Sequence, residues 1–154
     1  RPAPRSICGD GVSGAAAPAP ALGHVVETGI YVEDLDRACA FYEGVLGLAP
    51  MLSDARFRAY PLGRTVLLLF KRGSALETIQ LPGGTIPPHD GAGRLHFALA
   101  VAAADIGPWR LRLADHGVEI EGETCWPKGA VSLYFRDPDG NLLELVSPGL
   151  WANY

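Results

Sequence analysis

The chain has 154 residues and a mass of 16.3 kDa, enough for one domain or for two small half-domains that share a core. Apolar residues make up 48% and charged residues 19%, a composition typical of a folded globular protein. Thirteen Lys and Arg against 17 Asp and Glu give a net charge of −4 with no basic block, which argues against a nucleic-acid partner. The longest apolar run, 97–104, is far shorter than the roughly 20 residues of a membrane span, so we expect no membrane partner.

The first 23 residues differ from the rest of the chain because Ala, Gly and Pro dominate them without periodicity. We expect residues 1–23 to be a flexible tail that contributes nothing to the fold. The three cysteines, Cys8, Cys39 and Cys125, form no CxxC pair and leave an odd number, which is neither a disulfide framework nor a zinc motif. This usage favours a reducing, cytoplasmic location with Cys39 packed as a small apolar residue.

The first module, 24–82, is predicted to be βαβββ. Residues 25–32 alternate as a strand that places Glu27, Gly29 and Tyr31 on one face and apolar residues on the other. Asp34 is a good N-cap for a helix, and Gly47 follows the helix as its C′ residue. Three further strands are expected, at 49–52, 57–61 and 65–70.

The second module, 95–154, repeats this order after a loop at 83–94. We expect a strand at 95–101, a helix capped by Asp105 that ends at Gly117, and strands at 118–121, 131–136 and 142–146. Glu27 and His96 lie 69 residues apart, and Gly47 and Gly117 lie 70 apart. A repeat of this size predicts two half-domains with a shared core, in one domain over 24–148.

Three side chains are out of character with their strands. Glu27 and His96 occupy equivalent positions of the repeat, so we expect a pseudo-twofold axis to bring them to matching places on one sheet. Glu144 interrupts the apolar strand 142–146. Carboxylates on a concave apolar face are costly unless they are paired or bind a cation, so the three residues are candidate ligands of one divalent metal. The alternative is that Glu27 is solvent-facing and His96 an ordinary, non-ligating histidine.

Three segments of the chain occur in a characteristic order: 27–48 (ETGIYVEDLDRACAFYEGVLGL), 93–101 (GRLHFALAV) and 132–146 (SLYFRDPDGNLLELV). Together they resemble the vicinal oxygen chelate superfamily, which includes glyoxalase I, bleomycin-resistance proteins and extradiol dioxygenases. The resemblance covers about residues 24–147. It implies an α+β fold in which two βαβββ modules form a curled mixed-sheet cup with a divalent metal at its base.

The resemblance also implies the ligand positions. His96 and Glu144 match the usual residue types, whereas Glu27 stands where His is common. A fourth ligand position falls near Leu67 or Leu68, neither of which can bind a metal. One His with two carboxylates departs from the two-His pattern of non-haem iron dioxygenases, and the missing fourth ligand departs from glyoxalase I. The metal (Zn, Ni, Mn or Fe) is not determined by these residues.

The expected function is a divalent-metal-dependent enzyme that chelates adjacent oxygens of a small substrate, in the glyoxalase-like isomerase or lyase class. Glu144 and Glu27 are the candidate catalytic residues. Two alternatives stay open: a metal-free binding protein that sequesters a small molecule or antibiotic, as bleomycin-resistance relatives do, and a structural domain with vestigial cup residues. We expect a homodimer, with Leu150 and Trp151 as interface candidates. Candidate substrate-binding residues are Tyr31, His89, Trp126, Tyr134 and Arg136.

Overall fold

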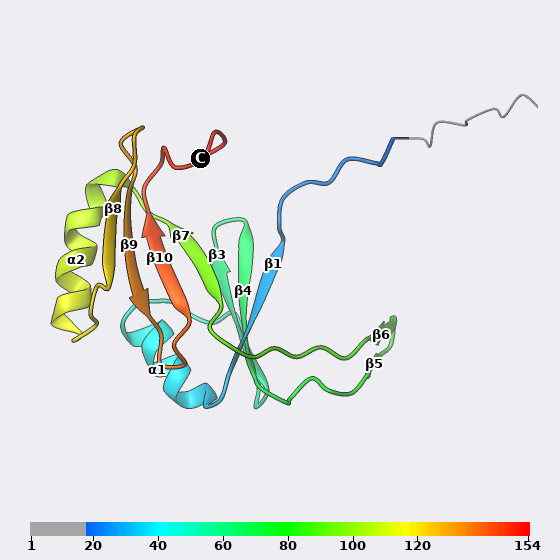
Figure 1. Ribbon diagram of the computed structural model, residues 1–154. Coiled ribbons are helices and arrows are strands. Elements are labelled where there is room, and N and C mark those ends of the chain that lie inside the picture. The colour runs from blue at the N-terminus through cyan, green and yellow to red at the C-terminus, as the bar shows by residue number, and fades with distance from the viewer. Residues whose placement is uncertain (1–17) are drawn as a thin grey trace, which may run out of the picture.

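The structure, a computed structural model, describes residues 18–154 and contains two four-stranded mixed sheets, each with one helix packed against it (Figure 1). This arrangement confirms the predicted α+β fold of two βαβββ modules. Of the expected tail, 1–17 lie outside the described residues, and 18–26 are exposed and belong to no helix or strand. In the described part of the chain, no helix is long and apolar enough to span a membrane.

The first module follows the sequence prediction closely. Its elements are β1 (Glu27–Val32), α1 (Leu35–Gly44), β2 (Leu52–Ser53), β3 (Phe57–Leu62) and β4 (Thr65–Lys71). The strand order is β1-β4-β3-β2, with β1 parallel to β4, so β1 is an edge strand. The N-cap Asp34 accepts a 3.0 Å hydrogen bond from the backbone N–H of Arg37, and Gly47 adopts a φ of 71° just after the helix.

The second module has the same topology. Its elements are β7 (His96–Ala100), a 3₁₀ turn η1 (Ala103–Asp105), α2 (Ile106–Asp115), β8 (Gly122–Cys125), β9 (Val131–Arg136) and β10 (Leu142–Val146). The strand order is β7-β10-β9-β8, so β7 is the edge strand that corresponds to β1.

Two local predictions in this module are wrong. The strand expected at 118–121 lies at Gly122–Cys125, because Val118 and Ile120 pack against the core on the way from α2 to the sheet. Asp105 makes no side-chain cap bond, because the 3₁₀ turn has already brought its backbone into a helical conformation.

The connection between the modules is not the plain loop that the sequence predicts for 83–94. It contains strand β6 (Gly84–Ile86), which pairs with β5 (Ile79–Leu81), at the end of the predicted first module, in a hairpin that extends beyond the two sheets in Figure 1. The turn is Pro82-Gly83, a dipeptide typical of turns in general, and it lies close to the more conspicuous Pro87-Pro88.

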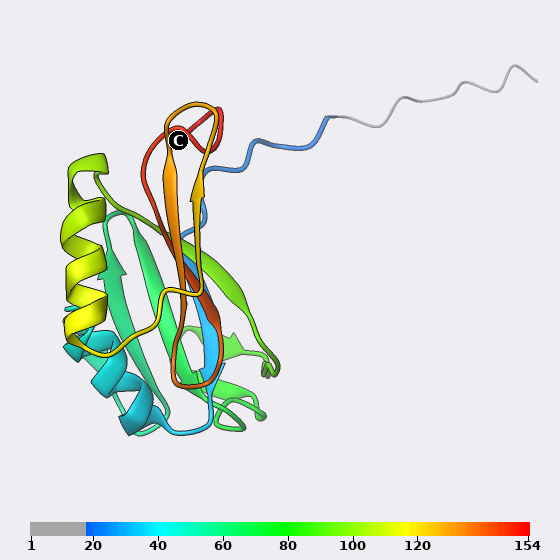
Figure 2. The same cartoon turned by 60° about the vertical axis from the view of Figure 1, so that its left-hand side comes forward.

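One hydrophobic core joins the modules. The helices lie on the same side of the molecule in Figure 2, and the buried side chains of both sheets belong to a single cluster. The sheets contribute nine residues to it: Ile30, Val32, Tyr60, Leu67, Leu69, Leu133, Phe135, Leu143 and Leu145. Because side chains alternate along a strand, the opposite faces of the sheets carry the polar candidates.

Candidate functional site

His96 and Glu144 lie together on the second sheet. Edge strand β7 runs parallel to β10, with His96 beside Leu142 and Ala98 beside Glu144 in the register. The His96 Nε2 atom lies 3.4 Å from Glu144 Oε2. Glu144 is only 4% exposed, whereas about half of the His96 side chain is open to solvent. The pair therefore combines a buried carboxylate with an accessible imidazole.

The hydrogen bonding of His96 fixes which ring nitrogen is free. Its Nδ1 atom lies 3.0 Å from the carbonyl oxygen of Leu142, and a carbonyl can only accept, so Nδ1 carries the proton and donates. Nε2 then faces the Glu144 carboxylate, so a neutral ring would oppose two acceptors. Such an arrangement is favourable only with a cation between them, either a proton on Nε2 or a metal ion.

The distance between the two atoms fits a metal ion. Two ligand atoms, each about 2.1 Å from one ion at a tetrahedral angle, lie about 3.4 Å from each other. The Nε2–Oε2 separation of 3.4 Å matches that spacing. A hydrogen bond from the second imidazole nitrogen to a backbone carbonyl is also the usual support for a ligating histidine. The donor set at this place is suitable for a divalent first-row metal.

Two further side chains lie behind Glu144. The hydroxyl of Ser132 lies 2.5 Å from Glu144 Oε1, and the indole Nε1 of Trp126 lies 2.8 Å from the Ser132 oxygen. Trp126 thus contacts Ser132, although the sequence predicts it to bind substrate, and the sequence predicts no role for Ser132. The available signal for Ser132 was a small polar residue between Val131 and Leu133 in a strand, where the surrounding residues are apolar.

Glu27, the third predicted ligand, lies on the other sheet. The expectation that it shares one sheet with His96 is wrong, because the modules pack through a common core and β1 and β7 remain edge strands of separate sheets. Within 18–154, no three His, Cys, Asp or Glu side chains gather closely enough to hold a metal ion. A single chain thus supplies the His96–Glu144 pair and, separately, the exposed carboxylate of Glu27.

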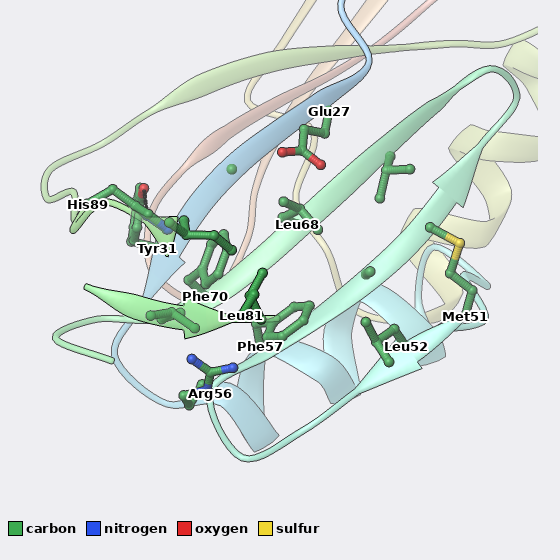
Figure 3. A pocket seen from close by; sticks show the side chains of 15 residues that line it. Glu27, Tyr31, Met51, Leu52, Arg56, Phe57, Leu68, Phe70, Leu81 and His89 are labelled. Carbon is green, nitrogen blue, oxygen red and sulfur yellow. Dashed lines mark hydrogen bonds between the residues drawn. The ribbon is translucent and has the colours of Figure 1, made fainter. Parts of the chain in front are cut away.

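Glu27 lines a cavity of about 640 Å³ on the open face of the first sheet (Figure 3). As predicted, Gly29 and Tyr31 share this face with it. Leu68 also lines the cavity and Leu67 is buried in the core, so the fourth ligand position holds an aliphatic side chain. The remaining lining is mainly apolar, with an aromatic wall of Tyr31, Phe57 and Phe70 and aliphatic side chains that include Leu81 and Ile86 of the hairpin.

Tyr31 and His89 form a hydrogen-bonded pair in the wall of this cavity. The Tyr31 hydroxyl lies 2.8 Å from His89 Nδ1, and the His89 ring meets Phe70 edge-on at a centroid distance of 4.7 Å. Burial, with a smaller effect from Asp90, raises the pKa of Tyr31, so the phenol keeps its proton at neutral pH.

The loop that carries His89 needs a glycine. A Cβ atom added to Gly91 would lie 2.4 Å from the Tyr31 ring, inside van der Waals contact. The absence of a side chain at this position lets the backbone pass directly over the ring of Tyr31.

The remaining substrate-binding candidates lie on the second sheet. Tyr134 is directly opposite Glu144 in the β9–β10 register, and its ring centroid lies 6.5 Å from that of His96. Arg136 donates to Glu121 at 3.0 Å and to the carbonyl oxygen of Gly140 at 3.1 Å, so its guanidinium already has partners. The predicted substrate-binding residues thus lie in two separate places. Tyr31 and His89 line the cavity at the first sheet, and the second module carries Trp126, Tyr134 and Arg136.

Comparison with known proteins agrees with this architecture. A model of the Glyoxalase/Bleomycin resistance protein/Dioxygenase superfamily matches residues 21–145. The chain is 30% identical over 130 residues to the glyoxalase domain-containing protein RDO1 of Mycosarcoma maydis, covering 82% of this chain and 67% of that protein. It is 31% identical over 119 residues to the metallothiol transferase FosB of Shouchella clausii, covering 74% and 73%.

A solved structure is similar over almost its whole length. The crystal structure of lactoylglutathione lyase from Agrobacterium tumefaciens aligns with a TM-score of 0.76 and 32% identity, covering 85% of this chain and 98% of that one.

Proposed function

The chain belongs to the Glyoxalase/Bleomycin resistance protein/Dioxygenase superfamily, and we propose that it is a divalent-metal-dependent enzyme of the glyoxalase-like isomerase or lyase class. Its substrate is a small molecule with two adjacent oxygens. The observation that carries this proposal is the His96–Glu144 pair, in which Nδ1 of the ring donates to a backbone carbonyl and Nε2 faces a buried carboxylate at 3.4 Å. The relatives named as a lactoylglutathione lyase and a metallothiol transferase support the same class of chemistry.

We propose that Glu27 of a second copy completes the ligand set in a homodimer. Both edge strands, β1 and β7, have an unpaired edge and begin with a candidate ligand, so a twofold axis can place each Glu27 beside the partner's His96. Two carboxylates and a neutral imidazole balance the charge of a divalent ion. Exposed apolar side chains near the open face, such as Met51 and Leu52, and Trp151 at the C-terminus, give a second chain surface to cover.

The residues of this chain divide the chemical work between them. His96, Glu144 and the partner-supplied Glu27 would hold Zn, Ni, Mn or Fe, which as a Lewis acid polarises the adjacent oxygens of a substrate. Glu27 is exposed at the cavity and is the candidate base that takes a proton from the substrate. The apolar wall excludes water, and the hydrogen-bonded pair of Tyr31 and His89 provides polar groups in that wall for the substrate.

The location that fits this proposal is the cytoplasm. Both cysteines in the described part of the chain, Cys39 and Cys125, are free thiols, which supports a reducing compartment.

Calorimetric titration of chelator-treated protein with Mn²⁺, Ni²⁺, Zn²⁺ and, anaerobically, Fe²⁺ tests the proposal. We expect one ion per chain in the wild type and at least about 100-fold weaker binding in His96→Ala and Glu144→Gln, because each removes a ligand. An apolar cavity also suits the alternative, a metal-free protein that sequesters a small molecule or antibiotic. Absence of metal binding in the wild type would overturn the enzyme proposal in favour of that alternative.

A further inference from the structure

We propose that Ser132 and Trp126 are positioning residues that hold the carboxylate of Glu144 in its metal-binding orientation. This inference rests on the proposed function, since it assumes that Glu144 is a ligand. The two residues come from β9 and from the segment between β8 and β9, so they approach Glu144 from outside its own strand. Their side-chain hydrogen bonds are made to each other and to Glu144, and not to His96.

The direction of each hydrogen bond follows from the chemistry of the groups. An indole N–H can only donate, so Trp126 Nε1 donates to the Ser132 oxygen at 2.8 Å. The single proton of Ser132 is then free to point at Glu144 Oε1, 2.5 Å away. A serine hydroxyl that donates to a carboxylate stabilises its ionised form. The chain Trp126–Ser132–Glu144 therefore runs one way and ends on Oε1 of the Glu144 side chain.

This chain determines which oxygen of Glu144 is available. Oε1 is occupied by Ser132, and Oε2 is the atom that lies 3.4 Å from His96 Nε2. Rotation of the carboxylate would break the bond to Ser132 in a place where little water can replace it, because Ser132 is fully buried and Glu144 is 4% exposed. The carboxylate is held with Oε2 toward the histidine before any ion arrives. Supports of this kind typically change metal affinity by about 10- to 100-fold.

A purely structural role for Ser132 makes a different prediction, and the chain offers a matched control. Ser147 is also buried, and its hydroxyl oxygen accepts a 2.9 Å hydrogen bond from the backbone N–H of Val131, the residue before Ser132. Ser147 makes no hydrogen bond to Glu144. Removing either hydroxyl costs a buried hydrogen bond in the same part of the sheet, but only Ser132→Ala frees the Glu144 carboxylate.

The experiment is a calorimetric titration of the chelator-treated full chain with Zn²⁺ and with Mn²⁺, accompanied by a thermal melt of each variant. We expect Ser132→Ala to bind metal about 10- to 100-fold more weakly than wild type, and Ser147→Ala to bind as wild type does. Ser132→Thr, which keeps the hydroxyl, restores most of the affinity. Trp126→Phe, which keeps the ring but loses the donor, weakens binding less than Ser132→Ala.

The outcomes separate this inference from the function on which it rests. Equal metal affinity of Ser132→Ala and Ser147→Ala, with the wild type binding tightly, overturns the positioning role and leaves the metal site standing. No metal binding in the wild type overturns both. If Ser132→Ala is too unstable to titrate, the metal affinity of Trp126→Phe decides. An affinity equal to that of the wild type would overturn the positioning role, and a weaker affinity supports it.

Discussion

The hydroxyl of Tyr42 in α1 donates a 2.8 Å hydrogen bond to Asp137 Oδ2 in the turn before β10, and so connects the two modules across 95 positions of the chain. Both residues are buried. Asp137 also accepts from the side chain of Asn141 and from the backbone N–H groups of Asp139 and Asn141. Burial and the neighbouring Asp137 raise the pKa of Tyr42, so the phenol remains a donor at all ordinary pH values.

The first prediction is that Tyr42→Phe destabilises the protein by about 1–2 kcal/mol, since a buried carboxylate loses one of its donors. For a chain of this size, that corresponds to a decrease in melting temperature of about 2–8 °C. The matched control is Tyr60→Phe, which removes a 3.0 Å bond to the exposed Glu43 within one module. If the two substitutions lowered the melting temperature equally, the Tyr42–Asp137 hydrogen bond between the modules would contribute no more to stability than the exposed bond within one module.

The second prediction concerns the pH dependence of stability at Asp139. Burial and the nearby Asp137 raise the pKa of Asp139, and its Oδ2 atom is buried without a hydrogen-bond partner among the described residues. The carboxyl group of Asp139 therefore binds its proton more tightly in the folded protein than in the unfolded chain. The resulting stabilisation is present at acid pH and is lost as the pH rises through the folded pKa. Asp139→Asn should therefore gain stability relative to wild type between pH 4 and pH 7.

Asp54 provides a control with the opposite sign. Burial acts to raise its pKa, but hydrogen bonds from Arg56 and from the backbone N–H of Phe57 outweigh burial and lower it. The stabilisation from Asp54 is present above its unfolded pKa and is lost as the pH falls through the folded one. Asp54→Asn should lose stability relative to wild type at pH 7 and approach it at acid pH. If the stabilities of Asp54→Asn and Asp139→Asn, each relative to wild type, changed in the same direction as the pH is raised, the opposite pKa shifts of the two residues would be contradicted.

The third prediction distinguishes a metal site shared between two chains from one within a single chain. Glu27→Gln and His96→Ala should each bind metal weakly when they are assayed alone. Mixed after subunit exchange, they should form a dimer with one intact site, made of Glu27 from one chain and His96 and Glu144 from the other. Calorimetry should then recover about one tight site per mixed dimer.

The control for this mixture is Glu144→Gln combined with His96→Ala, since both lesions lie in the same half-site and cannot complement each other. Sedimentation should show a dimer in every sample. Failure of the Glu27→Gln and His96→Ala mixture to recover any site, although the dimers exchange, would contradict ligand sharing.

The fourth prediction concerns the wall of the cavity. Gly91→Ala places a methyl group 2.4 Å from the Tyr31 ring, which must displace the loop and separate His89 from Tyr31. We expect the affinity of the cavity for the fluorescent probe 8-anilinonaphthalene-1-sulfonate to fall several-fold, with metal affinity unchanged. Gly83→Ala lies in the same connection, where an added Cβ meets nothing within 4 Å, and should bind the probe as wild type does. Unchanged probe binding in Gly91→Ala would place the probe elsewhere.

The local structure was largely predictable from sequence because it depends on short-range patterns. The strands at 131–136 and 142–146 coincide with β9 and β10, and Asp34 caps the helix as expected. Face assignments within a strand were also correct, since Glu27, Gly29 and Tyr31 share the open face. Alternation and capping need no knowledge of distant residues.

The relation between the modules was not predictable in this way. The repeat identifies Glu27 and His96 as equivalent, but not whether β1 and β7 meet within one chain. That depends on which apolar surfaces of the two modules bury each other, and Ile30, Val32, Leu143 and Leu145 are equally apolar in either arrangement. Ser132 was overlooked for a similar reason, because its importance comes from Glu144 and Trp126 across the sheet.

The hairpin connection between the modules acts as a tether. Residues 72–94 join two halves that already share a core, and the turn between β5 and β6 lies outside that core. The covalent link therefore raises the effective concentration of one half for the other, while the packed apolar surfaces hold them together. If the chain is cut between Gly83 and Gly84, the two fragments together still contain every buried residue. They should therefore associate as separate polypeptides. Within one chain, the two related modules therefore pack against each other as two subunits would.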